Sequence, residues 1–395
     1  MIEKDSITEL ISFIKELYVP KYISDREKKI EGIFVPLHEP NFPGNEKKYL
    51  LETIDSTFVS SVGAFVDRFE KDMSSIAHTK RSVALVNGTS ALQISLILAG
   101  VKPHNEVLTQ ALTFVATANS IAYTGANPVF IDVDRDTMGL SPDSLERFLT
   151  NNAELRDDGC YNKVTKAKIS ACVPMHTFGF MCRIDKIIKI CKKWKIPVVE
   201  DAAEALGSSY KGKPSGSFGL LSAFSLNGNK IITSGGGGAI TTNNETIADQ
   251  AKHLTTTAKI PHKWEYFHDK IGYNYRMPNL NAALACAQLE KLNLIKNSKR
   301  DVYNQYQSFF EDKGIKLMNI PKETEWNYWL MSILLDDKKD RDLFLTETNQ
   351  NGVMTRPIWQ LMYRLPEFKD CQKDNQRNAE FLEERIVNIP SSAIL

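Results

Sequence analysis

Three side chains in the middle of the sequence carry types and spacings that suggest chemistry. The apolar run 196–201 ends in the acids Glu200 and Asp201, and a second apolar run about twenty residues later reaches Ser225. Lys230 follows in a polar loop before four glycines. In open α/β sheets, ligands bind at the carboxyl ends of the strands. The carboxylate, the hydroxyl and the amine are therefore expected to meet in one crevice.

An amine, a carboxylate and hydroxyls near glycine-rich turns are the groups that pyridoxal phosphate (PLP) requires. Its aldehyde needs an amine for a Schiff base, its ring nitrogen needs a carboxylate, and its phosphate needs hydroxyls and backbone N–H groups. Lys230, Asp201 and Ser225 fit these roles. The segment "NGTSALQISL" (87–96) adds a phosphate cradle at the positive end of a helix. Its members are the tight-turn glycine and two hydroxyl residues: Gly88, Thr89 and Ser90.

Each of these features has an ordinary alternative. Lys230 alone reads as a solvated loop lysine and Asp201 as a helix N-cap. The glycines 235–238 alone read as a flexible turn. Their order and spacing together favour a cofactor site.

The elements that must position these residues alternate between strands and helices along residues 80–245. Such alternation predicts a mostly parallel sheet with helices on both faces, because each crossover carries a helix. Strands are expected at 106–109, 128–134, 168–174 and 196–201, and helices at 90–99, 114–124, 142–149 and 183–195.

Three parts of the chain are expected. Residues 1–35 form an N-terminal extension with an amphipathic helix, whose start reads as a capping box of Ser6 and Glu9. This helix is either a separate N-terminal extension or a helix that simply packs on the body of the protein. Residues 36–277 form the large cofactor-binding domain. Residues 278–395 form a linking helix (278–313, ended by Gly314) and a small α/β domain, with a strand at 326–335 and helices at 340–352 and 375–385.

Composition excludes several classes of protein. The 395 residues carry 49 Lys+Arg against 48 Asp+Glu, a net charge of +1, so no overall field favours nucleic acid or an anionic membrane. Six cysteines form no C-x-x-C pair, which predicts neither a metal site nor disulfides and points to the cytoplasm. No apolar run is long enough to span a bilayer. No G-x-G-x-x-G motif supports a Rossmann dinucleotide site.

The motifs resemble those of the DegT/StrS family of sugar aminotransferases from about Pro36 to the C-terminus. The resemblance implies the PLP-dependent, aspartate aminotransferase-like fold (fold type I). The N-terminal extension and the segments 59–70, 254–262 and 351–359 look most like the LegC-type branch. The matching motifs are "GTSAL" (88–92), "TFVATANSI" (113–121), "PVFIDVD" (128–134), "HTFG" (176–179), "VVEDAAEALGS" (198–208), "FSLNGNK" (224–230), "GYNYRMPNLNAAL" (272–284) and "TRPIW" (355–359).

The resemblance assigns roles around the cofactor. Lys230 would form the Schiff base, Asp201 would pair with the ring nitrogen and Phe114 would stack on the ring. Glu204, often Gln in the family, would contact the phenolic oxygen, where it adds a charge. Asn274 would reach the phosphate in the neighbouring subunit, which implies a homodimer with shared sites. The phosphate itself would be held by Thr89 and Ser225.

The sequence predicts the substrate-binding residues less clearly than the cofactor-binding residues. His176 is either a general base or a buried polar residue with its hydrogen bonds satisfied. Arg276 either binds substrate or braces the following helix, and Trp329 reads as core. The candidates for binding a nucleotide sugar are His176, Tyr275, Arg276, Arg356 and Trp359.

The resemblance implies transamination of a nucleotide-linked 4-keto-6-deoxy-N-acetylhexosamine, UDP- or GDP-linked, with L-glutamate as donor. The 4-amino product would be used in the biosynthesis of legionaminic acid, a bacillosamine-type sugar or a related surface glycan. Members that dehydrate the sugar carry His in place of the lysine, so Lys230 favours amination. Two alternatives stay open: amination of a different keto sugar (a GDP-perosamine-type or 3-keto substrate), or a PLP-bound sugar sensor without turnover.

Overall fold

The computed structural model describes residues 4–22, 32–311, 313 and 315–395. Two hydrogen-bonded sheets are joined by the parallel bridges Cys172–Val198 and Met175–Asp201 into one central sheet. β11 runs antiparallel to its neighbours, and the β10–β7, β6–β2 and β2–β3 pairs are parallel. The prediction of a mostly parallel sheet is confirmed. Its strands, in spatial order, are β1 (Arg81–Leu85), β11 (Gly238–Thr242), β10 (Leu221–Ser225), β7 (Val199–Asp201), β6 (Lys168–Val173), β2 (Glu106–Gln110) and β3 (Asn127–Ile131).

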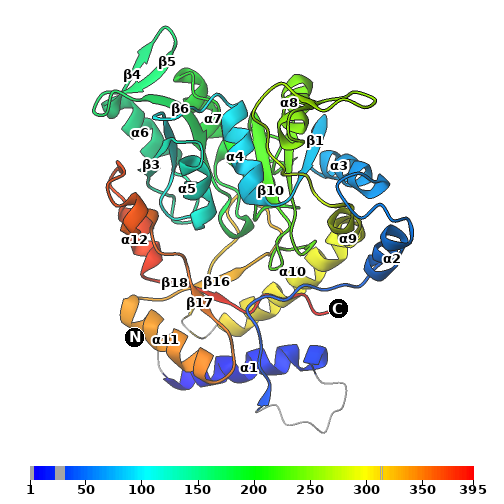
Figure 1. Cartoon of the computed structure of the whole chain (residues 1–395). Coiled ribbons are helices and arrows are strands. Elements are labelled where there is room, and N and C mark those ends of the chain that lie inside the picture. Colours follow the sequence, from blue (N-terminus) through cyan, green and yellow to red (C-terminus); the bar gives the residue numbers. More distant parts are fainter. Residues whose placement is uncertain (1–3, 23–31, 312, 314) are drawn as a thin grey trace.

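Helices cover both faces of this sheet (Figure 1). Neighbouring residues of one strand point to opposite faces, so Val107 of β2 packs in one buried apolar cluster and Leu108 in another. Burial on both faces explains why the strands are nearly continuous in apolar residues. The covering helices are α3 (Ala64–Ile76), α4 (Gly88–Leu98), α5 (Val115–Ala122), α6 (Pro142–Asn152), α7 (Ile184–Lys193) and α8 (Glu245–Thr255).

A second, antiparallel sheet lies below the central one in Figure 1 and is called the C-terminal sheet here. It is flanked by α10 (Leu292–Phe310), α11 (Lys338–Gln350) and α12 (Arg377–Glu383). Its strands, in order, are β14 (Lys316–Leu317), β16 (Met331–Leu334), β18 (Ile386–Ile389) and β17 (Arg356–Pro357).

Two sequence predictions in this region need correction. The helix expected at 278–313 is broken at Lys291 into α9 (Asn279–Glu290) and α10, because α9 packs against α2 (Glu46–Asp55) and α3 whereas α10 continues toward the C-terminal sheet. Gly314 lies outside the described residues. The strand expected at 326–335 is restricted to Met331–Leu334. The preceding residues form a loop in which Tyr328 has a φ of 59°, outside the extended region.

The N-terminal helix α1 (Lys4–Tyr22) lies against α11 at the bottom of Figure 1. Ile7, Leu10 and Ile14 are buried at the spacing of one helix face. The expected capping box is wrong, because Ser6 lies inside the helix. Lys4 in the first turn pairs with Glu347 of α11 at 2.8 Å, so tertiary packing extends the helix beyond the expected start.

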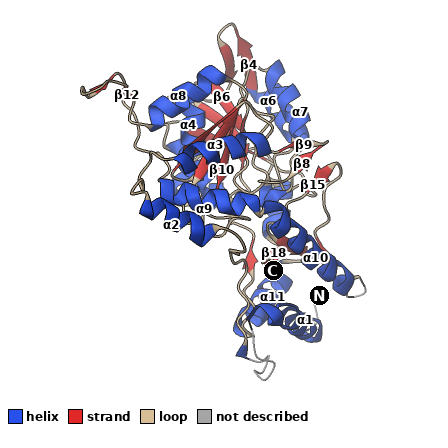
Figure 2. Ribbon diagram, turned by 90° about the vertical axis from the view of Figure 1, so that its right-hand side faces the viewer, coloured by secondary structure: helices blue, strands red, loops and turns tan. Residues whose placement is uncertain are grey.

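The remaining strands are short: β4 and β5 extend the central sheet beside β6, β15 pairs with the β8–β9 hairpin, and β12 and β13 form a separate hairpin. Figure 2 shows the β12–β13 hairpin projecting away from the body. None of the helices in the described ranges is long and apolar enough to cross a membrane. The short strands are β4 (Ala153–Arg156), β5 (Gly159–Asn162), β8 (Ser209–Tyr210), β9 (Lys213–Pro214), β12 (Lys259–Ile260), β13 (Phe267–His268) and β15 (Thr324–Glu325).

The glycines at 235–238 are not equivalent. Gly238 begins β11 and pairs with Leu85 on one side and Ser225 on the other. A Cβ at Gly238 would lie 2.4 Å from the carbonyl carbon of Asn87, which is backbone and cannot turn aside. At Gly236 the nearest atom to such a Cβ is 3.7 Å away. Of these two positions, only Gly238 requires glycine, because two chain segments approach each other closely there.

Gly238→Ala should therefore lower the free energy of unfolding by about 1–3 kcal/mol, the usual cost of overpacking. Denaturant unfolding of the variant measures this. Gly236→Ala is the matched control and should stay close to wild type. Equal stability of the two variants would contradict the assignment.

Candidate active site

Lys230 lies in the loop between β10 and β11, with its side chain turned into the protein. Its Nζ lies 3.1 Å from Oε1 of Glu204 and 4.2 Å from the centre of the Trp329 ring. The side chain is only 12% exposed. Trp329 is held in turn by donating its indole N–H to the carbonyl of Asn229 at 2.7 Å. The amine is thus enclosed between a carboxylate and an aromatic face.

Glu204 is a buried carboxylate with two different partners. One oxygen faces Lys230, and Oε2 accepts the backbone N–H of Phe178 at 2.9 Å. Burial raises the pKa of Glu204 to about 7, although Lys230 and the Phe178 N–H oppose the rise. The carboxyl therefore changes charge near neutral pH.

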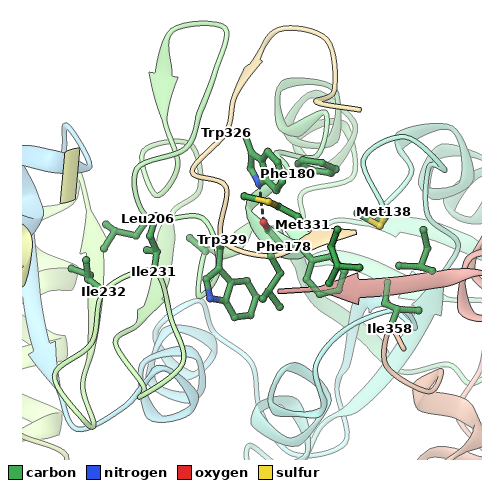
Figure 3. Packing of buried hydrophobic residues seen from close by; sticks show 14 of the residues in the cluster. Met138, Phe178, Phe180, Leu206, Ile231, Ile232, Trp326, Trp329, Met331 and Ile358 are labelled. Atoms are coloured by element: carbon green, nitrogen blue, oxygen red, sulfur yellow. Dashed lines mark hydrogen bonds between the residues drawn. The ribbon is translucent and has the colours of Figure 1, made fainter. Parts of the chain in front are cut away.

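Phe178 and Trp329, whose ring centres lie 6.2 Å apart, belong to the cluster of buried hydrophobic residues drawn in Figure 3. Phe178 has a φ of 55°, and its carbonyl accepts the indole N–H of Trp326 at 2.8 Å. This left-handed turn at 177–179 directs the Phe178 N–H toward Glu204. Trp329, expected as core, is indeed 3% exposed, yet it also lines the cavity described below.

Asp201 ends β7 at the carboxyl edge of the central sheet. Its Oδ2 accepts the hydroxyl of Thr117 at 2.7 Å and its Oδ1 accepts the N–H of Ala203 at 3.2 Å. Burial raises its pKa, while Thr117 and Ala203 lower it. These two donors fix the direction of the carboxylate, and α5 supplies the first of them.

The residues expected to form a phosphate cradle lie at the start of α4. Asn87 is the N-cap, and its Oδ1 accepts the N–H of Ser90 at 2.7 Å. A Cβ on Gly88 would lie 2.8 Å from Cβ of Ser225, so the two loops touch here. Gly88, Thr89 and Ser225 line the cavity, whereas Ser90 does not, because its amide is engaged by the cap.

A cavity of about 660 Å³ joins these groups. Nine of the predicted residues line it: Gly88, Thr89, Phe114, Asp201, Glu204, Ser225, Lys230, Arg356 and Trp359. Sequence reasoning assigned no role to several other lining residues. Four of them lie inside the quoted motifs, where the motif itself was the available signal: Asn87, Phe178, Asn227 and Asn229. The others come from outside these motifs and are brought to the cavity by the fold: Leu37, Gln360 and Asn388.

Three candidate residues from "GYNYRM" do not line the cavity of this chain. Asn274 is exposed, and its backbone pairs with Thr256. Tyr275 donates its hydroxyl to Gln93 of α4 at 3.2 Å. The backbone of Arg276 pairs with Leu85 at the end of β1.

His176 is also absent from the cavity wall and is fully buried. Its Nε2 lies 3.1 Å from Glu200, and its Nδ1 lies 3.1 Å from Sγ of Cys182. Burial lowers the pKa of His176, but Cys182 and Glu200 outweigh it and raise the pKa to about 10. This arrangement favours the alternative of a buried polar residue with its hydrogen bonds satisfied.

The donor set fits PLP. An amine, a carboxylate and two hydroxyls at a helix N-terminus share one cavity, and the contact of Gly88 with Ser225 leaves no room for a side chain in the cradle. Phe114 is 48% exposed and stands at the N-cap of α5, free to stack on a planar ring. No group of three or more His, Cys, Asp or Glu side chains in the described part of the chain is arranged to hold a metal ion.

The raised pKa of Glu204 predicts a pH-dependent effect on stability. Between its ordinary value of 4.5 and about 7, the unfolded chain has lost this proton while the folded chain retains it, so stability falls as pH rises. In cofactor-free protein, the free energy of unfolding of wild type minus that of Glu204→Gln should fall between pH 4.5 and 7 and then level off. Denaturant titrations at several pH values measure it.

Glu52→Gln, at an exposed position of α2, controls for the substitution itself. Parallel curves for wild type and Glu204→Gln across this pH range would show that Glu204 does not titrate there in the folded protein.

Comparison with known proteins shows the family to which the chain belongs. The sequence pattern of the DegT/DnrJ/EryC1/StrS aminotransferase family matches residues 41–395. The chain is 34% identical over 361 residues to GDP-perosamine synthase of Escherichia coli O157:H7, covering 91% of this chain and 93% of that protein. It is 34% identical over 362 residues to the putative pyridoxal phosphate-dependent aminotransferase EpsN of Bacillus subtilis, covering 90% of each.

Among solved structures, PseC of Helicobacter pylori, an aminotransferase involved in pseudoaminic acid biosynthesis, superimposes with a TM-score of 0.82. The match covers 91% of this chain and 94% of that one at 23% identity, which shows the shared fold. The extent of the family match and the identity to curated relatives lead to one conclusion. The chain belongs to the DegT/DnrJ/EryC1/StrS family and is a PLP-dependent aminotransferase of fold type I.

Proposed function

We propose that this enzyme transfers an amino group from L-glutamate to the C4 keto carbon of a nucleotide-linked 4-keto-6-deoxy-N-acetylhexosamine. The observation that carries the proposal is the enclosed Lys230 amine beside Glu204, in a cavity that also contains Phe114, Arg356 and Trp359. The product would be a 4-amino sugar for legionaminic acid, a bacillosamine-type sugar or a related surface glycan.

The proposed chemistry assigns a task to each residue around the amine. PLP, when bound, supplies an electron sink for removing a proton from carbon. Lys230 would hold it covalently, and the Lys230 amine would serve as the proton carrier at the donor's α-carbon. Asp201 would pair with the ring nitrogen and favour its protonated form by its opposite charge. Glu204, with its pKa raised by burial to about 7, holds the Lys230 amine in place.

The part of the cavity wall that contains Arg356 and Trp359 is proposed to bind the nucleotide sugar. Arg356 is the arginine in its lining, and a guanidinium binds a diphosphate through paired hydrogen bonds. The rings of Phe114 and Trp359 lie 6.3 Å apart at an edge-to-face angle and offer apolar surface for a sugar or base. The volume of about 660 Å³ accommodates a substrate of this size class.

A GDP-linked keto sugar of the perosamine type is the second candidate substrate. It is favoured by the three relatives named GDP-perosamine synthase, which are 33–34% identical to the chain. Both candidates place the keto group at C4 and use the same residues around the amine. A sensor without turnover is disfavoured, because Lys230, Asp201 and Ser225 all line the cavity.

We also propose a homodimer in which Asn274 reaches the phosphate site of the partner subunit. Asn274 is exposed and is not among the residues that line its own chain's cavity, which leaves it available to a neighbouring subunit. Large apolar side chains exposed on α2, on the segment after it and on the β12–β13 hairpin offer surface for a second copy. They are Leu51, Ile54, Phe58, Val62, Trp264, Phe267 and Ile271.

The function is tested by the visible absorbance of the PLP-loaded enzyme. Excess L-glutamate should convert the cofactor to its amino form in wild type, and adding a keto sugar from a panel of UDP- and GDP-linked compounds should reverse the change. Lys230→Ala should lower turnover by about 10³-fold or more, because it removes both the attachment point and the proton carrier. Substantial turnover in this variant, or no response of wild type to any donor, would refute the proposal.

Shared sites predict complementation between inactive variants. Asn274→Ala should weaken retention of PLP, and mixing it with Lys230→Ala should restore about a quarter of wild-type activity. After equal mixing, half of the dimers contain one chain of each variant, and one of the two sites in each of these dimers is intact. Asp201→Asn in place of Asn274→Ala is the mixing control, because Asp201 and Lys230 line the cavity of the same chain and no dimer of these two variants has an intact site. No recovery beyond that expected from the Asn274→Ala chains alone would contradict the shared site.

A further inference from the structure

The N-terminal helix α1 lies outside the part of the chain that matches the family, which begins at residue 41. Its buried face packs on the helices of the C-terminal sheet, where Phe13 stacks on Phe309 of α10 with ring centres 4.4 Å apart. Lys4 pairs with Glu347 of α11, and Glu9 pairs with Lys313.

One connection runs from α1 through α11 to the cavity. Near the end of α11, Asn349 accepts a hydrogen bond from Arg356 at 3.0 Å, while Thr348 bonds the hydroxyl of Thr355 at 2.6 Å. The Asn349 amide also donates to the carbonyl of Thr355 at 3.2 Å. The end of α11 thus sets the position of Arg356, which lines the cavity.

A second connection runs through the chain that follows α1. Val35 is hydrogen-bonded on both sides to the segment before Arg356, to the carbonyl of Gly352 and the N–H of Met354, each at 2.8 Å. Two residues later Leu37 lines the cavity, and its carbonyl accepts the N–H of Ser391 at 2.8 Å.

The same C-terminal segment is held by α1 itself. The hydroxyl of Tyr18 donates to the carbonyl of Ser392 at 3.2 Å, and the hydroxyl of Ser392 accepts the N–H of Glu39 at 2.9 Å. Tyr18 is fully buried, and Asn388 of the adjacent strand β18 lines the cavity. Figure 1 shows α1 beneath α11 and the C-terminal sheet, on the side away from the central sheet.

We propose that α1 is a brace that positions Arg356 and the cavity wall formed by residues 356–360 for the nucleotide sugar. The inference rests on the proposed function, because Arg356 serves there as the diphosphate ligand. The bonds that make up the brace hold the segment around Arg356 and do not include the loop that carries Lys230. Loss of α1 docking therefore weakens binding of the sugar and leaves binding of PLP and the glutamate half-reaction intact.

The test compares full-length enzyme with Leu10→Asp, which places a charge at a fully buried position of α1 and undocks the helix. KM for the nucleotide sugar should rise about tenfold, the scale of a charge-assisted contact, with kcat and the glutamate-driven spectral change near wild type. Thr8→Ala, on the exposed face of α1, is the matched control. An unchanged KM in Leu10→Asp would overturn the proposal.

A double-variant cycle separates action through Arg356 from general damage. Asn349→Ala leaves α1 in place and removes the contact between α11 and Arg356, so it should raise KM in the same way. In the Arg356→Ala background, Leu10→Asp should have little further effect on KM. Additive effects would show that α1 does not act through Arg356 and would overturn the proposal.

Amide hydrogen exchange provides a readout that needs no substrate. Exchange at Met354 and its neighbours should accelerate in Leu10→Asp and stay unchanged in Thr8→Ala, because the Met354 N–H is bonded to Val35. If wild type aminates no sugar, the proposed function fails while this measurement still tests the brace. Unchanged exchange in Leu10→Asp would refute the brace whatever the substrate is.

Discussion

The structure depends most on the need to hold one lysine amine inside a protein. Lys230 is almost enclosed, and its charge is balanced by Glu204, which is itself buried. A buried charge is costly unless it is paired and hydrogen-bonded, so both groups must be placed by rigid surroundings. The second oxygen of Glu204 is satisfied by the Phe178 N–H, and the open side of the amine is covered by Trp329. The pair thereby links the end of β7, the left-handed turn at Phe178 and the loop before β16.

A second buried network supports the strand that carries this site. Glu200 accepts the N–H groups of Phe218 and Gly219 and the hydroxyl of Ser222, in addition to facing His176. Burial raises its pKa, but these donors and His176 bring the pKa below its ordinary value. Adjacent residues of one strand point to opposite sides, so Glu200 serves packing while Asp201 faces the cavity. This division explains why only one of the two acids lines the site.

The chain outside the central sheet supplies the other half of the cavity. Arg356 and Asn388 come from paired strands of the C-terminal sheet, and Leu37 comes from the segment leading out of the N-terminal extension. The central sheet therefore provides the reacting groups, while the C-terminal sheet and the extension shape the space for substrate. Differences among relatives in this second wall can change the substrate without changing the chemistry at Lys230.

Local sequence patterns determined the central sheet, the helix starting at Gly88 and the set of reactive residues. These signals are short-range: strand ends, a helix N-cap and glycine turns read the same in isolation as in the fold. Tertiary structure alone decided that His176 is buried against Glu200 and that α9 and α10 are separate helices. It also brought Leu37, Trp329 and Asn388 to the cavity. The physical reason is that these outcomes depend on contacts between segments far apart in the chain, which residue types and spacing do not encode.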